Sequence, residues 1–274
     1  MAHVLIPTDL SPNALNAAVY AIHLYGEEGN TFLLVNTYGL PITLEEPSTM
    51  TMEVLALAST EGLERFAAQL RDALPDHAPE IMVHSRPGDL ADVLMELESS
   101  SPAPDLVVMG TQGHSGLERI LVGGNTAAVI KNLRTPILAV PEQARYTAPR
   151  RIVLADDGGP VVKATMKVLL DIARWSKAEV RIVHVVPEER TSEDDLSASG
   201  YDVLLGAIPH TYHSVSGDNV MVALHDLAHQ SDADLVVVLH RHRGIFEQLF
   251  HRSMSTRLAM HTHIPMLVLQ QGAA

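Results

Sequence analysis

Short runs rich in valine, isoleucine and leucine alternate along the chain with longer stretches of helical composition. This alternation is typical of βαβ units, in which helices bury a parallel sheet on both faces. Ten such runs fall at residues 4–8, 32–37, 81–84, 106–109, 137–140, 152–155, 180–185, 211–215, 235–239 and 266–269. The pattern predicts an α/β fold with two tandem doubly wound, Rossmann-like parallel sheets, each of strand order 3-2-1-4-5.

The second half of the chain repeats the first. Residues 104–140 align without a gap with residues 233–269, at a constant offset of 129 positions. A chain of 274 residues is long enough for two domains that each bury a core. We therefore expect one domain at residues 1–147 and a second at residues 148–274, with the boundary near residues 146–150.

Helix starts support the repeat. Ser11 followed by Pro12 predicts an N-cap and the first residue of a helix. Gly159 followed by Pro160 repeats this arrangement 148 positions later. Because the offset falls from 148 to 129 further along, the second copy lacks 19 residues around its second helix.

Four glycines of the first copy form a pattern suited to a phosphate. Gly110 and Gly113 follow a strand, whereas Gly123 and Gly124 precede a helix expected to begin near Asn125. Without a Cβ, such residues let backbone N–H groups approach an anion, and the helix N-terminus adds partial positive charge. The alternative is that these glycines only make turns. The spacing is neither a Walker loop nor a dinucleotide fingerprint.

Strand one should end beside this glycine segment. In an open α/β sheet the ligand crevice lies at the carboxyl ends of the strands where the strand order reverses, here between strands one and four. Asp9 follows strand one and could accept a hydrogen bond from a base or a ribose. It could equally serve only to neutralise the dipole of the following helix.

The second copy has lost the glycines. Leu239, His242 and Arg252 stand at the positions of the first three glycines, and their side chains would block a close approach of phosphate. We therefore expect one working site, in the first domain, and a degenerate second domain.

Composition excludes several classes of function. The net charge of −14 argues against binding to nucleic acid or to an anionic membrane, and no apolar run approaches the ~18 residues of a membrane span. Cysteine is absent, which excludes disulfides, thiolate metal sites and a cysteine nucleophile. A soluble protein of the reducing cytoplasm is expected.

Histidines gather in the second copy, where ten of the fifteen lie. They include the pairs His225 with His229, His240 with His242, and His261 with His263, which could bind Zn²⁺ if two pairs converged. Without a cysteine or a clear third ligand, solvated histidines are the favoured interpretation, and no metal site is expected. Residues 240–257 also form a locally basic, partly aromatic run, which suits an acidic partner, the other domain or an ordinary solvated face.

Four segments closely resemble the universal stress protein family in its tandem two-domain form: VLIPTDLSPNALNA, LLVNTY, MGTQGHSGLERILVGGNTAAVI and RTPILAVP. Family members that bind ATP hold ribose and phosphates on the glycine segment. The resemblance implies Pro7, Thr8, Asp9 and Thr37 near adenine, and Met109, Gly110, Gln112, Gly113, Gly123, Gly124 and Asn125 around ribose and phosphate. It also implies that the two copies pair as a pseudo-symmetric dimer, and a homodimer of chains is possible.

One residue departs from the family pattern. Gly124 stands where the family has serine or threonine, so one hydroxyl donor to phosphate is missing unless Asn125 or Thr126 supplies it. A hydrogen bond to a charged group is worth roughly 1.5 to 3 kcal/mol, so affinity would fall about tenfold or more. The expected ligand is ATP or AMP, with Mg²⁺ to offset the charge of a triphosphate.

Three functions compete. The first is a stress-response protein that binds an adenine nucleotide, with at most weak ATPase activity and no identified catalytic residue. The second is a nucleotide-independent scaffold whose glycine loop is a relic. The third, an ATP-dependent α/β enzyme, is the weakest, because the sequence shows neither a catalytic cluster nor a second substrate site.

Overall fold

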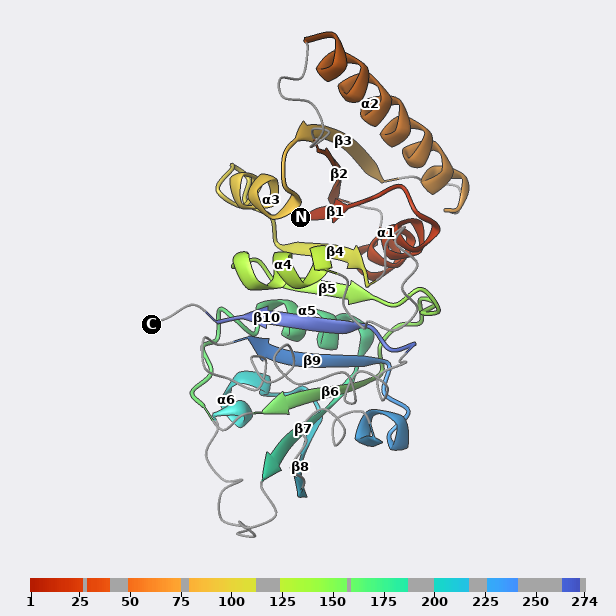
Figure 1. Cartoon of the computed structure of the whole chain (residues 1–274). Coiled ribbons are helices and arrows are strands. Elements are labelled where there is room, and N and C mark those ends of the chain that lie inside the picture. Colours follow the sequence, from red (N-terminus) through yellow and green to blue (C-terminus); the bar gives the residue numbers. More distant parts are fainter. Residues whose placement is uncertain are drawn as a thin grey trace. The chain divides into compact units, whose positions relative to one another are not determined.

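Each of two units in the computed structural model contains one five-stranded parallel sheet (Figure 1). The first unit is Met1–Tyr146 and the second is Thr147–Ala274. The structure describes residues 1–26, 29–39, 49–74, 79–111, 124–156, 159–186, 200–216, 226–240 and 263–271. Within these ranges, no helix is long and apolar enough to cross a membrane.

The first unit alternates strands and helices. Its elements are β1 (His3–Pro7), α1 (Pro12–Tyr25), β2 (Thr31–Tyr38), α2 (Thr49–Asp72), β3 (Glu80–Pro87), α3 (Leu90–Glu98), β4 (Leu106–Gly110), α4 (Gly124–Asn132) and β5 (Ile137–Val140). The strands lie in the order β3-β2-β1-β4-β5, all parallel. Helices cover the sheet as two pairs, α1 with α2 and α3 with α4 (Figure 1). The predicted fold class and strand order are confirmed.

The second unit repeats this strand order, and its described helices α5 and α6 are shorter than α1 and α2. Its elements are β6 (Arg151–Asp156), α5 (Lys167–Ser176), β7 (Glu179–Val186), α6 (Tyr201–Leu205), β8 (His210–Ser216), β9 (Leu235–His240) and β10 (Met266–Gln270). Its strands lie in the order β8-β7-β6-β9-β10. The registers repeat as well: His3 lies opposite Thr31, and Arg151 lies opposite Glu179, 148 positions later.

Apolar strands form the core of each sheet. β1 is buried from Val4 to Pro7, and β4 is buried from Leu106 to Met109. β3 is different, since Met82 and Val83 are 44% and 39% exposed at the end of the sheet order. The central strands therefore hold the unit together and fix where their carboxyl ends lie.

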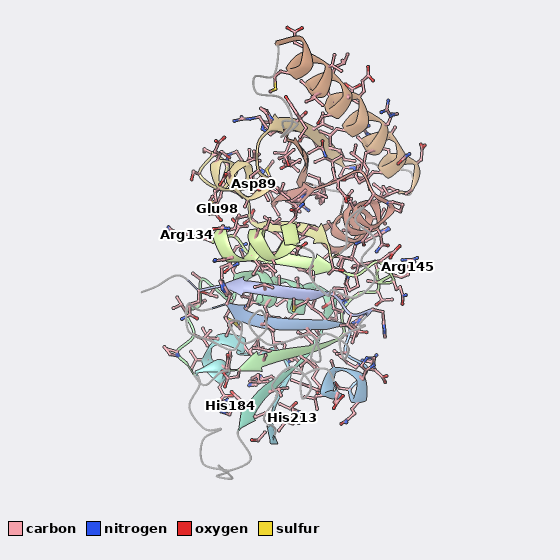
Figure 2. The ribbon with its side chains drawn as sticks, viewed as in Figure 1. Asp89, Glu98, Arg134, Arg145, His184 and His213 are labelled. Carbon is pink, nitrogen blue, oxygen red and sulfur yellow. The ribbon has the colours of Figure 1, made fainter. Side chains whose placement is uncertain are left out.

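Side-chain caps begin two helices of the first unit. Ser11 Oγ accepts a hydrogen bond from the Ala14 N–H at 3.2 Å, and Pro12 is the first helical residue, as predicted. Asp89 caps α3 in the same way by accepting from the Ala91 N–H at 2.9 Å (Figure 2). Such caps satisfy N–H groups that have no partner inside the helix.

The prediction that Gly159 and Pro160 begin a helix is wrong. α5 begins at Lys167, and its N-cap residue, Met166, makes no side-chain cap. Glycine has no side-chain oxygen that could replace the Ser11 cap. The Pro160 carbonyl instead accepts a hydrogen bond from Gln271 Nε2 at 2.9 Å, which ties this segment to the end of β10.

Candidate functional site in the first unit

Asp9 lies two residues after the end of β1, in a loop held by its own side chains. The Leu10 N–H donates to Thr8 Oγ1 at 2.9 Å, and the Ser11 N–H donates to Asp9 Oδ1 at 3.1 Å. Leu10 has a φ of 65°, a left-handed conformation that is unfavourable for a residue with a branched side chain. Its side chain lies against Gly62 of α2, where an added Cβ would come within 2.6 Å of Leu10 Cδ1. The packing of α2 thus supports the strained loop.

A cavity of about 370 Å³ opens at the carboxyl ends of β1, β2 and β4. This volume falls within the range of ~300–1,000 Å³ typical of small-molecule sites. The first residues of α3 and α4 complete the wall. The described residues that line the cavity are Pro7, Thr8, Asp9, Ala14, Asn36, Thr37, Leu90, Met109, Gly110, Thr111, Gly124, Asn125 and Thr126.

Eight of the eleven candidate residues from the sequence line this one cavity. They are Pro7, Thr8, Asp9, Thr37, Met109, Gly110, Gly124 and Asn125. The other three, Gln112, Gly113 and Gly123, lie outside the described residues. Segments that are far apart in the sequence therefore meet where the strand order reverses.

Sequence analysis missed four residues of the wall: Ala14, Asn36, Leu90 and Thr111. Asn36 could have been found, because it is the first polar residue after the apolar run of β2. The signals of Ala14 and Leu90 are weak, since an alanine and a leucine on helices usually pack in the core.

The two described glycines of the site, Gly110 and Gly124, differ in whether the packing around them requires a glycine. A Cβ on Gly110 would come within 2.7 Å of Nδ2 of the buried Asn13, so the packing of α1 against β4 requires glycine. A Cβ on Gly124 would meet no atom of the described residues within 4 Å. Thr126, in the first turn of α4, is buried and donates its hydroxyl hydrogen to the Gly110 carbonyl at 3.1 Å. Of the two predicted substitutes for the missing hydroxyl, Asn125 is therefore the better placed.

The charge of the wall is low. Among the described lining residues, Asp9 is the only ionisable side chain. Positive potential comes from the N-terminus of α4, where the first N–H groups of a helix have no partner inside the helix. This arrangement suits an uncharged or weakly anionic ligand group better than a bare triphosphate.

A chain of hydrogen bonds connects the cavity wall with α2 and β3. Asn36 Nδ2 donates to the Thr8 carbonyl at 2.7 Å, and Asn36 Oδ1 accepts from Ser59 Oγ at 2.7 Å. Ser85 Oγ in turn donates to Ser59 Oγ at 2.6 Å. These bonds fix the ends of β1, β2 and β3 relative to one another on the edge that carries the cavity.

Glu98 fixes the two helices that flank the cavity. This last residue of α3 accepts hydrogen bonds at Oε1 from the Arg134 N–H at 2.8 Å and the Thr135 hydroxyl at 2.7 Å (Figure 2). The Thr135 N–H also donates to it. Since Thr135 follows α4, one carboxylate joins the C-terminal ends of α3 and α4, whose first residues line the cavity.

The second unit carries ionisable residues at the matching edge. Asp156 and His184 stand 148 positions after Thr8 and Asn36. The Tyr201 hydroxyl donates to Asp156 Oδ1 at 3.1 Å, and His184 Nδ1 lies 3.4 Å from Asp156 Oδ2 (Figure 2). Burial, together with the Asp156 carboxylate, strongly raises the pKa of Tyr201. This edge is therefore chemically unlike its counterpart in the first unit.

Three of the six histidines in the predicted pairs lie in the described ranges. His240 Nδ1 lies 2.6 Å from Gln270 Oε1, and the rings of His229 and His263 meet edge to face with centroids 5.9 Å apart. His225, His242 and His261 lie outside those ranges, as does most of the basic run 240–257. Within the part of the chain that the structure describes, no three potential metal ligands cluster.

The family model described as "Universal stress protein family" matches residues 1–141 and 149–270. The chain therefore belongs to the universal stress protein family. Universal stress protein MJ0531 of Methanocaldococcus jannaschii is 31% identical over 138 residues, which cover 50% of this chain and 80% of that protein.

One solved structure supports the fold over nearly the whole chain. A universal stress protein of Archaeoglobus fulgidus superposes with a TM-score of 0.72 at 18% identity, covering 98% of this chain and 96% of its own. A universal stress protein crystallised in complex with cAMP aligns with 51% of this chain and 96% of its own, at 22% identity and a TM-score of 0.39.

Proposed function

We propose that the first unit binds an adenine nucleotide, AMP or ATP, in the cavity at the ends of β1, β2 and β4. The base lies near Pro7, Thr8, Asp9 and Thr37, and the phosphates lie at the start of α4. The protein then acts in the stress response of the cytoplasm by binding, with at most slow hydrolysis.

One observation carries this proposal. Eight residues chosen from the sequence for contact with a nucleotide come from β1, β2, β4 and α4, and all of them line one cavity of about 370 Å³. The cavity lies where open α/β sheets bind their ligands, and the N-terminus of α4 offers partial positive charge to a phosphate.

Mg²⁺ supports the binding of a triphosphate in this proposal. The described wall contains one carboxylate, Asp9, and no cationic side chain. A divalent cation that carries several waters would offset the phosphate charge. AMP has fewer charges and needs this help less.

Calorimetric titration of the nucleotide-stripped full chain with AMP, ADP and ATP, each with and without Mg²⁺, tests the proposal. We expect saturable binding, with Mg²⁺ tightening ATP more than AMP. The chain offers a matched pair of variants: Asp9→Ala should weaken binding, whereas Asp157→Ala, 148 positions later, should not. No binding at millimolar nucleotide would favour the scaffold function instead.

We also propose that the two units pair through their last strands. β5 and β10 are short and apolar, and each closely follows a proline, Pro136 or Pro265. Exposed strands of this kind invite pairing with another strand. Residues 1–145 expressed alone should then form a homodimer or aggregate. A monodisperse monomer at tens of micromolar in analytical ultracentrifugation would contradict the pairing.

A further inference from the structure

The amide of Asn36 is held in one orientation. Its oxygen accepts the Ser59 hydroxyl hydrogen at 2.7 Å, and its nitrogen donates to the Thr8 carbonyl at 2.7 Å. Because a carbonyl oxygen can only accept, Nδ2 must face Thr8, and a flipped amide would place two acceptors against each other. The Ser85 hydroxyl uses its hydrogen on Ser59, which leaves the Ser59 hydrogen for Asn36.

The fixed amide retains one unused donor. An amide nitrogen carries two hydrogens, and among the described residues only the Thr8 carbonyl accepts from Nδ2. Asn36 lines the cavity, so the second hydrogen is a polar group that it can offer to a ligand. A donor that is already oriented loses little conformational entropy when it binds.

We propose that Asn36 is a specificity-determining residue, and that its second amide hydrogen donates to one ring nitrogen of the bound purine. The inference rests on the proposed function, since it assigns a role within the same cavity. Adenine has three ring nitrogens that can accept: N1, N3 and N7. Thr37 is next along β2 and Thr8 is its bonded partner, so Asn36 stands among the residues assigned to the base.

Atomic replacement in the ligand tests this role. Full-length protein is titrated with AMP and with three AMP analogues in which N1, N3 or N7 of the base is replaced by C–H. We expect one analogue to bind about tenfold more weakly than AMP, because the donor then faces a carbon, and the other two to bind within about twofold.

Variants tie the effect to Asn36. In Asn36→Ala the penalty for that one analogue should disappear, although AMP itself binds more weakly. In Ser59→Ala, which removes the hydroxyl that holds Asn36 Oδ1, the penalty should shrink while the fold is kept. Thr60→Ala is the matched control, because in the described part of the chain the Thr60 hydroxyl bonds only within α2, to the Ala56 carbonyl at 2.9 Å. It should change neither affinity nor penalty.

The experiment distinguishes a failure of the role proposed for Asn36 from a failure of the proposed function. If the wild-type chain binds AMP but treats all three analogues alike, or if the penalty persists in Asn36→Ala, the role of Asn36 is overturned and the proposed function stands. If AMP does not bind at all, both are overturned.

Discussion

Gly124 is the residue at which this chain departs from the family pattern, and its position leaves room among the described residues. An added Cβ would meet no described residue within 4 Å. Gly124→Ser should therefore fold normally and supply the missing hydroxyl to phosphate. A hydrogen bond to a charged group suggests about a tenfold gain in ATP affinity, measured by calorimetry.

Gly110→Ser is the contrasting variant. Its Cβ would come within 2.7 Å of Asn13 Nδ2, so it should disturb the packing of α1 and weaken both stability and binding.

Unchanged or weaker ATP binding by a well-folded Gly124→Ser variant would contradict the assignment of phosphate to the start of α4.

At the residue scale, the sequence predicted which residues line the cavity better than it predicted the structural role of each residue. The family resemblance, together with the strand order and the pattern of glycines, named eight residues that line the cavity. The role of Gly110 in packing against Asn13 could not be read from the sequence, because it depends on the distance between α1 and β4. The orientation of the Asn36 amide could not be predicted, because its bonds to Thr8 and Ser59 join residues 28 and 23 positions away.

Among the elements, α3 and α4 should depend on Glu98. Glu98→Ala removes the acceptor of three hydrogen bonds, two of them from backbone N–H groups. We expect a loss of about 1–3 kcal/mol in the free energy of unfolding of the first unit, measured by denaturant titration.

Glu96→Ala is the control on the same helix. Its pair with Arg86, at 2.8 Å, has side chains 65% and 44% exposed, and such surface pairs contribute about 0–1 kcal/mol. Equal losses in the two variants would show that Glu98 does not join the helices.

α6 and β8 are joined by a contact that should depend on pH. His210 Nε2 lies 2.8 Å from Asp202 Oδ1, and its Nδ1 lies 2.8 Å from the Ile208 carbonyl, so both ring nitrogens face acceptors. Only the protonated ring has a hydrogen on each nitrogen. The bond to Asp202 raises the pKa of His210 above 6.5, and Tyr212, which donates to the same carboxylate oxygen, helps His210 to lower the pKa of Asp202.

The raised pKa of His210 determines in which direction stability changes with pH. The contribution of His210 to stability is complete below pH 6.5 and is lost as pH rises through the raised pKa. NMR titration of the ring should give a pKa above 6.5 that falls in Asp202→Asn. An unchanged His210 pKa in Asp202→Asn would refute the contact.

The elements themselves were largely predictable, because apolar runs mark strands that are buried on both faces. The start of α5 was not predictable from the repeat. Pro160 stands 148 positions after Pro12 of α1, but Gly159 lacks the side chain with which Ser11 caps α1. The contact of Pro160 with Gln271 spans 111 positions and leaves no local signal.

For the whole molecule we expect one nucleotide per chain. Leu239 is buried at the position of Gly110, and the buried Asp156 bonds Tyr201 where the first unit has the neutral Thr8. Calorimetry at saturation should give a stoichiometry of one, and Asp9→Ala should weaken that single site. Two equivalent sites would contradict the difference between the units.

Joining the two copies in one chain removes a constraint that identical subunits share. In a symmetric homodimer every substitution appears twice, so a residue that suits one subunit is imposed on the other. Here Asp156 and His184 of the second copy stand at the register of Thr8 and Asn36 in the first. The first unit keeps a cavity whose described wall has Asp9 as its one ionisable side chain, whereas the second unit places a carboxylate and an imidazole 3.4 Å apart at the matching register, so the two halves of one polypeptide can carry different chemistry.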